Sequence, residues 1–147
     1  MPNLPRKKVG LIACSGEELA EGTVTRRAVR KVLETLRPDD TVTLCLPLFL
    51  AGGEGERAFA RHYPTIAVDG CDKRCAALAT EKYSAEPAAS VVATKVAKES
   101  GYGALGTART LNAEGKRLAD AVAEKIVAET DRLLKRKPGS APVREKR

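Results

Sequence analysis

The feature that most restricts the fold of this chain is an apolar run, Thr65 to Val68, that ends at Asp69-Gly70. Thr, Ile and Val side chains favour strands, whereas Asp-Gly is a turn dipeptide that ends them. From Asp72 to Tyr83 the less polar residues recur at helical spacing. The junction therefore predicts a buried strand whose carboxyl end leads directly into an α-helix.

The same alternation of strand and helix recurs along the chain. Further strands are expected at 9–13, 41–46 and 90–94, and helices at 23–36 (capped by Thr23 or Thr25), 54–61, 72–83 and, after Asn112, to about residue 135. Alternating elements favour parallel strands joined by right-handed crossovers. We therefore predict an α/β fold: a single three-layer domain of about four mainly parallel strands flanked by helices.

The formal net charge of +7 is concentrated at the two ends of the chain. Residues 1–8 carry +3 and residues 135–147 carry +5, so residues 9–134 carry −1. A nearly neutral body with 3% aromatic residues disfavours nucleic acid as a partner, because base stacking needs aromatic side chains. We expect a basic extension over 1–8, the folded domain over 9–136 and a disordered basic tail over 137–147.

The cellular compartment of the protein can be predicted from the polarity of its N-terminus and from its cysteines. No apolar run approaches the ~20 residues of a membrane helix, and residues 1–8 lack the apolar core of a signal peptide. In a cytoplasmic protein the four cysteines stay reduced, which favours metal binding or thiol chemistry over structural disulfides. We therefore expect a cytoplasmic protein without a membrane partner.

The cysteines follow the predicted strands. Cys14 comes after the first strand, Cys45 lies at the end of the second, and Cys71 follows the third. The carboxyl ends of parallel strands meet at one edge of a sheet, where α/β proteins bind their ligands. Cys75 is expected one helical turn after Cys71, as its neighbour on the helix. The pattern therefore predicts four thiols at one edge.

The motif Asp69-Gly70-Cys71 with Cys75, together with the outlying Cys14 and Cys45, resembles the DGC domain family, which is named for its Asp-Gly-Cys motif. The resemblance covers roughly residues 9 to 96. It implies a zinc-binding protein without an assigned reaction, and it implies that these four cysteines are the metal ligands.

The residue types leave three classes of function open. Four thiolates suit tetrahedral Zn²⁺ but also an iron–sulfur cluster. Alternatively, Cys71 and Cys75 form a dithiol for redox chemistry or sulfur transfer. A third hypothesis is an interaction module that binds its partner through the basic ends. Any single cysteine can also be a small core residue, since free cysteine is commonly buried.

Polar neighbours of the cysteines have plain structural roles as their first interpretation. Asp69 is expected to form the turn or cap the helix rather than to orient a ligand, although Ser15 and Asp69 could do so. Lys73 and Arg74 either stabilise thiolates or form a solvated helical turn. His62, the single histidine, is predicted at the opposite edge of the sheet, in a surface or helix-capping role.

Residues 101–106 match the pattern G-x-G-x-x-G. A dinucleotide-binding fingerprint needs a strand just before the glycines and a helix that opens from them. Here the polar stretch Lys95 to Ser100 precedes them, and the next predicted helix begins only after Asn112. We therefore predict a loop that could cover the cysteine edge rather than a cofactor site.

Overall fold

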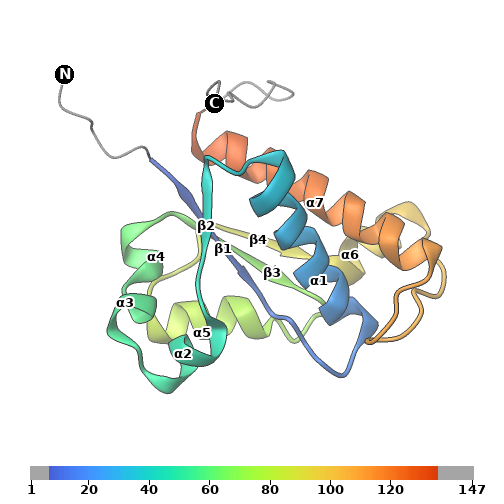
Figure 1. Cartoon of the computed structure of the whole chain (residues 1–147), viewed down its shortest axis with the longest axis horizontal. Helices are drawn as coiled ribbons and strands as arrows, with labels where there is room; N and C mark the ends of the chain where they lie inside the picture. The colour runs from blue at the N-terminus through green and yellow to red at the C-terminus, as the bar shows by residue number, and fades with distance from the viewer. Residues whose placement is uncertain (1–6, 136–147) are drawn as a thin grey trace.

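The computed structural model describes residues 7–135 and is built on a four-stranded sheet (Figure 1). All the strands are parallel, in the spatial order β2-β1-β3-β4. The strands are β1 (Val9–Ala13), β2 (Thr41–Thr43), β3 (Thr65–Asp69) and β4 (Ala89–Val92). The predicted α/β architecture is confirmed, and β3 is followed by a helix that begins at Cys75 rather than at residue 72.

Helices cover both faces of the sheet, which makes three layers (Figure 1). One face carries α1 (Ala20–Lys31), α6 (Ala93–Ser100) and α7 (Ala113–Leu133); the other carries α2 (Leu46–Ala51), α3 (Glu54–Arg57), α4 (Phe59–His62) and α5 (Cys75–Tyr83). Alternate residues of β3 point to opposite faces. Ile66 and Val68 therefore join the larger core under α1 and α7, whereas Ala67 joins a smaller core around Phe59.

The second strand is shorter than predicted. β2 ends at Thr43, and the apolar residues that follow begin α2 at Leu46. Pro47, expected to end the strand, occupies the first turn of α2, where a missing N–H disturbs no helical hydrogen bond. Cys45 consequently lies at the N-cap of α2 rather than at a strand end.

Other boundaries also differ from the prediction, and the helix expected at 54–61 is divided into α3 and α4. The helix expected at 23–36 begins at Ala20, and its last residues form a π-helical turn, η1 (Val32–Leu36), closed by the Arg37 N–H on the Val32 carbonyl at 2.8 Å. β4 ends at Val92, and α6 starts at once with Ala93. The C-terminal helix is confirmed, with the Asn112 side chain accepting the Gly115 N–H at 2.9 Å.

Residues 136–147, which include the predicted tail, lie outside the described residues, as do residues 1–6. Among residues 7–135, no helix is both long enough and apolar enough to span a membrane. The longest helix, α7, carries charged residues along its whole length.

A buried ion pair ties the end of η1 to the far end of α7. The Arg37 guanidinium donates from Nε and Nη2 to the two carboxylate oxygens of Asp131 at 2.9 and 2.8 Å. Both side chains are nearly inaccessible to solvent. Removing one partner of such a pair leaves a buried charge without compensation, which is far more harmful than removing both.

We expect Asp131→Ala to lower the free energy of unfolding by about 3–5 kcal/mol, measured by urea denaturation. The double variant R37M/D131L should lose less, because it removes both charges of the pair together. A loss below about 1 kcal/mol for Asp131→Ala would show that the pair behaves as a solvated surface contact.

Candidate functional site

Cys14 is the best-anchored of the four cysteines. Its N–H continues the pairing between β1 and β3 by donating to the Val68 carbonyl at 2.9 Å. Its Sγ accepts the Gly70 N–H at 3.3 Å and lies 3.6 Å from Oγ1 of Thr25. The half-buried thiol therefore touches the β3–α5 loop and α1 at once.

Thr25 is a functional neighbour that the sequence pattern did not identify. It was expected as a helix cap, but it is fully buried inside α1. Its hydroxyl donates to the Gly22 carbonyl at 2.7 Å and accepts the Ser15 N–H at 3.3 Å. Ser15 has a left-handed backbone, with φ at 50°. This bond therefore helps to hold the strained loop after β1 in place.

The loops that leave β1 and β3 are packed tightly against the start of α1. A Cβ atom on Gly22 would lie 2.0 Å from the Gly16 carbonyl oxygen, and one on Gly70 would lie 2.9 Å from the backbone of Glu21. The chain passes to opposite sides of β1 at this point, because β2 and β3 flank it. Such switch points are where open α/β sheets bind ligands.

Cys71 lies in the β3–α5 connection and Cys75 is the first residue of α5, so the two are not on one helix as predicted. α5 begins at Cys75, and Arg74 before it is left-handed, with φ at 52°. The Arg74 N–H instead closes a turn on the Cys71 carbonyl at 3.2 Å. The argument that Cys71 and Cys75 are helical neighbours is therefore wrong. Cys71 is half-buried and Cys75 is exposed.

Asp69 caps α5 from outside the helix. Its two carboxylate oxygens accept the N–H groups of Ala76 and Ala77 at 2.7 and 3.2 Å. The carboxylate is almost fully buried, and this burial raises its pKa against the opposing effects of the two hydrogen bonds and of Arg74. The capping role predicted for Asp69 is confirmed, and it fixes the direction in which α5 leaves the sheet.

The four cysteines lie at the predicted edge, but they are not gathered. Cys14, Cys45 and Cys71 each follow the carboxyl end of a strand, and Cys75 opens the helix after β3. Within residues 7–135, which include all four, no three His, Cys, Asp or Glu side chains form an arrangement that could hold a metal ion. The donors are of the right kind for zinc, but this conformation does not bring them together.

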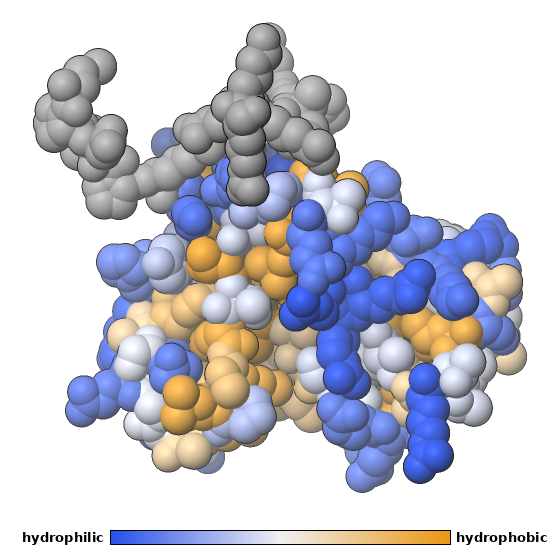
Figure 2. All heavy atoms as spheres, in the orientation of Figure 1, coloured by the Kyte–Doolittle hydropathy of each residue, from blue (hydrophilic) through white to orange (hydrophobic). Residues whose placement is uncertain are grey.

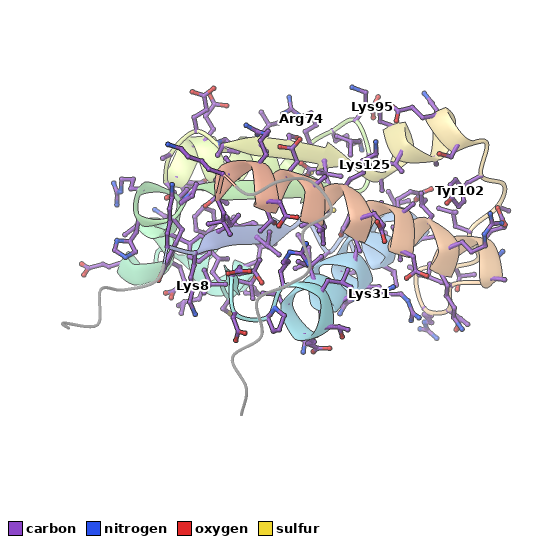
Figure 3. All side chains as sticks on the ribbon, turned by 90° about the horizontal axis from the view of Figure 1, so that it is seen from above. Lys8, Lys31, Arg74, Lys95, Tyr102 and Lys125 are labelled. Carbon is purple, nitrogen blue, oxygen red and sulfur yellow. The ribbon has the colours of Figure 1, made fainter. Side chains whose placement is uncertain are left out.

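Two cavities open at this edge. One, of about 460 Å³, is lined by Cys14 and Ser15, by the β2–α2 connection and by α1. Apolar side chains gather on the surface beside β2 and α2, including the half-exposed Leu48 and Leu50 (Figure 2). The second cavity, of about 490 Å³, lies beside the Cys71 loop and is bordered by cations of which Figure 3 labels Arg74 and Lys95.

The remaining candidates have structural or surface positions. Arg74 donates weakly to the Ser90 hydroxyl at 3.4 Å, and Lys73 is exposed. His62 is exposed at the end of α4, with its ring 4.7 Å from the ring of Tyr63. It precedes β3, so it is at the amino edge of the sheet, opposite to the cysteines, as predicted.

Comparison with protein families identifies the chain. The DGC domain model matches residues 10–126. This protein belongs to the DGC domain family. Comparisons with curated proteins and with solved structures gave no significant match. The matched range includes every cysteine and extends beyond α6 into α7, further than the resemblance read from the motif.

The raised pKa of Asp69 predicts a pH dependence of stability. Because the folded state holds this proton more tightly than the unfolded state does, the stabilising contribution is fully present below the unfolded pKa of about 3.9 and is lost as the pH rises through the folded pKa. Relative to Asp69→Asn, which does not titrate, the wild type should therefore lose stability as the pH rises above about 3.9.

The measurement is the free energy of unfolding of both proteins across this range, with the exposed Asp72→Asn as the matched control. The free energy of unfolding of the control should change with pH in the same way as that of the wild type. A wild type that instead gains stability relative to Asp69→Asn as the pH rises would mean that the two hydrogen bonds outweigh burial.

Proposed function

We propose that this DGC-domain protein binds a metal ion, Zn²⁺ in the first place, through Cys14, Cys45, Cys71 and Cys75. The supporting observation is that every cysteine of the chain falls at the carboxyl edge of the sheet, although the residues come from three separate connections. Thiolates are the soft ligands that structural zinc sites use. An iron–sulfur cluster would take the same donors.

Binding requires a change in conformation. Cys14 is held by its neighbours, whereas Cys45 and Cys75 are exposed at the first turns of α2 and α5. We therefore expect the connections that carry Cys45 and Cys75 to move toward Cys14 and Cys71 when metal binds. The free energy of metal binding commonly drives such ordering, because a preformed site rarely exists without the metal.

The direct test is the metal content of protein purified without chelators, measured by mass spectrometry of the elements. Each Cys→Ser variant should lose metal to a similar extent, because all four thiolates complete one site. His62→Asn is the control, since His62 is not a proposed ligand and is exposed at the opposite edge of the sheet, and it should keep full metal content. Loss of metal in His62→Asn would replace the four-cysteine site with a different ligand set.

A dithiol is the second candidate, and one observation favours it. Cys71 and Cys75 are separated by three residues, and the turn that the Arg74 N–H closes on the Cys71 carbonyl lies between them. As a dithiol, the pair would pass two electrons and two protons to a partner disulfide and become a disulfide itself.

This candidate predicts a different set of essential residues. A Cys71–Cys75 disulfide should appear by mass spectrometry after mild oxidation, and Cys14→Ser and Cys45→Ser should leave it unchanged. Metal-free protein that forms this disulfide would exclude the zinc proposal. An equal loss of metal in all four Cys→Ser variants would exclude the dithiol hypothesis.

A further inference from the structure

A cavity of about 340 Å³ that no cysteine lines is bordered by four cations. It lies between α1, the loop 101–112 and the first turn of α7, and no carboxylate lines it. Its lining residues are Thr23, Arg26, Arg27, Arg109, Thr110, Leu111 and Lys116. The loop joins α6 to α7 at the end of the molecule where Figure 3 labels Tyr102.

Hydrogen bonds within the loop and to α1 hold the loop that carries Arg109 in a defined conformation. The Thr107 and Thr110 backbones close a turn at 2.9 Å, and the Thr23 hydroxyl of α1 donates to the Ala108 carbonyl at 2.5 Å. Gly106 has φ at +98°, and a Cβ there would lie 2.6 Å from the Thr110 carbonyl oxygen. The last glycine of the G-x-G-x-x-G pattern therefore serves to fold this turn against α1.

The charge of the cavity is not balanced locally. Arg27, Arg109 and Lys116 form no ion pair within residues 7–135, and Arg26 has only an exposed contact with Glu17 at 3.3 Å. Cations close by on the same helices are paired: Arg30 with Glu34, Lys31 with Asp120, and Arg117 with Glu114. Because residues 9–134 carry a net −1, the cluster does not reflect an overall basic domain.

Like charges held close together destabilise the fold unless something offsets them. In this cavity, a bound anion could supply the negative charge that offsets the repulsion between the cations. We propose that this cavity binds the phosphate groups of a small phosphorylated molecule. Arg27 and Arg109, the two lining arginines without an ion pair, supply the planar donor forks that recognise phosphate oxygens bidentately. Lys116 adds a point charge, and the exposed hydroxyl of Thr110 adds a further donor.

The size and lining of the cavity favour a small molecule over nucleic acid. About 340 Å³ is near the lower end of ligand pockets, which start at about 300 Å³. The lining includes no aromatic ring on which a base could stack. The proposal is independent of the metal site, because no cysteine lines this cavity.

The test is calorimetric titration of the full chain with inorganic pyrophosphate, with inorganic phosphate and with a single-stranded oligonucleotide. A chelator is present so that pyrophosphate cannot act through zinc. We expect pyrophosphate to bind more tightly than phosphate, with an affinity that falls as salt rises. R27Q/R109Q should weaken pyrophosphate binding about tenfold or more, and K116Q should weaken it less.

The matched control is R61Q/K125Q, which removes the same charge from exposed positions outside the cavity. It should change the affinity less than about twofold, since distant exposed charges are screened. Thermal melting checks that each variant is folded. Equal weakening in both double variants, unchanged binding in R27Q/R109Q, or binding of the oligonucleotide alone would each overturn the proposal.

Discussion

The arrangement of the carboxyl edge depends on the close approach between the start of α1 and the loops that leave β1 and β3. Glycine permits it: Gly22 packs on the Gly16 carbonyl, and Gly70 packs on the backbone of Glu21. Thr25 then joins the β1 loop to α1 through its buried hydroxyl. Any larger residue at Gly22 would push α1 away from the sheet. The contact of Thr25 with the Cys14 thiol would then be lost.

The parts of the fold that could be predicted from sequence are those with an unambiguous spacing of apolar residues or with turn residues that end the element. The β-branched run before Asp69-Gly70 and the long apolar stripe of α7 are examples, and the alternation of elements implied a parallel sheet. α2 could not be found in this way. Its apolar residues continue those of β2 without interruption, so the strand appeared to run to Leu46.

For the site, the topology predicted the edge but not the local conformation. The position of Cys71 after β3 follows from the strand alone, whereas its relation to Cys75 depends on one left-handed residue, Arg74. Nothing in the residue type of an arginine signals that conformation. The role of Thr25 was hidden for a similar reason, because a threonine near a helix start is expected to cap it, and here tertiary packing buries it.

The cationic cavity and the cavity beside Cys14 share one side chain. Arg26 borders both the cavity beside Cys14 and the cationic cavity, and its carboxylate partner Glu17 belongs to the loop that carries Cys14. An anion that drew Arg26 away from Glu17 would release this loop from one of its contacts. Exposed ion pairs contribute about 0–1 kcal/mol, so occupancy of one site could alter affinity at the other by about fivefold at most. Thermodynamic coupling is reciprocal, so metal bound at the cysteine edge would affect the anion by the same factor. A larger coupling would therefore have to come through the backbone of α1, which both sites contact.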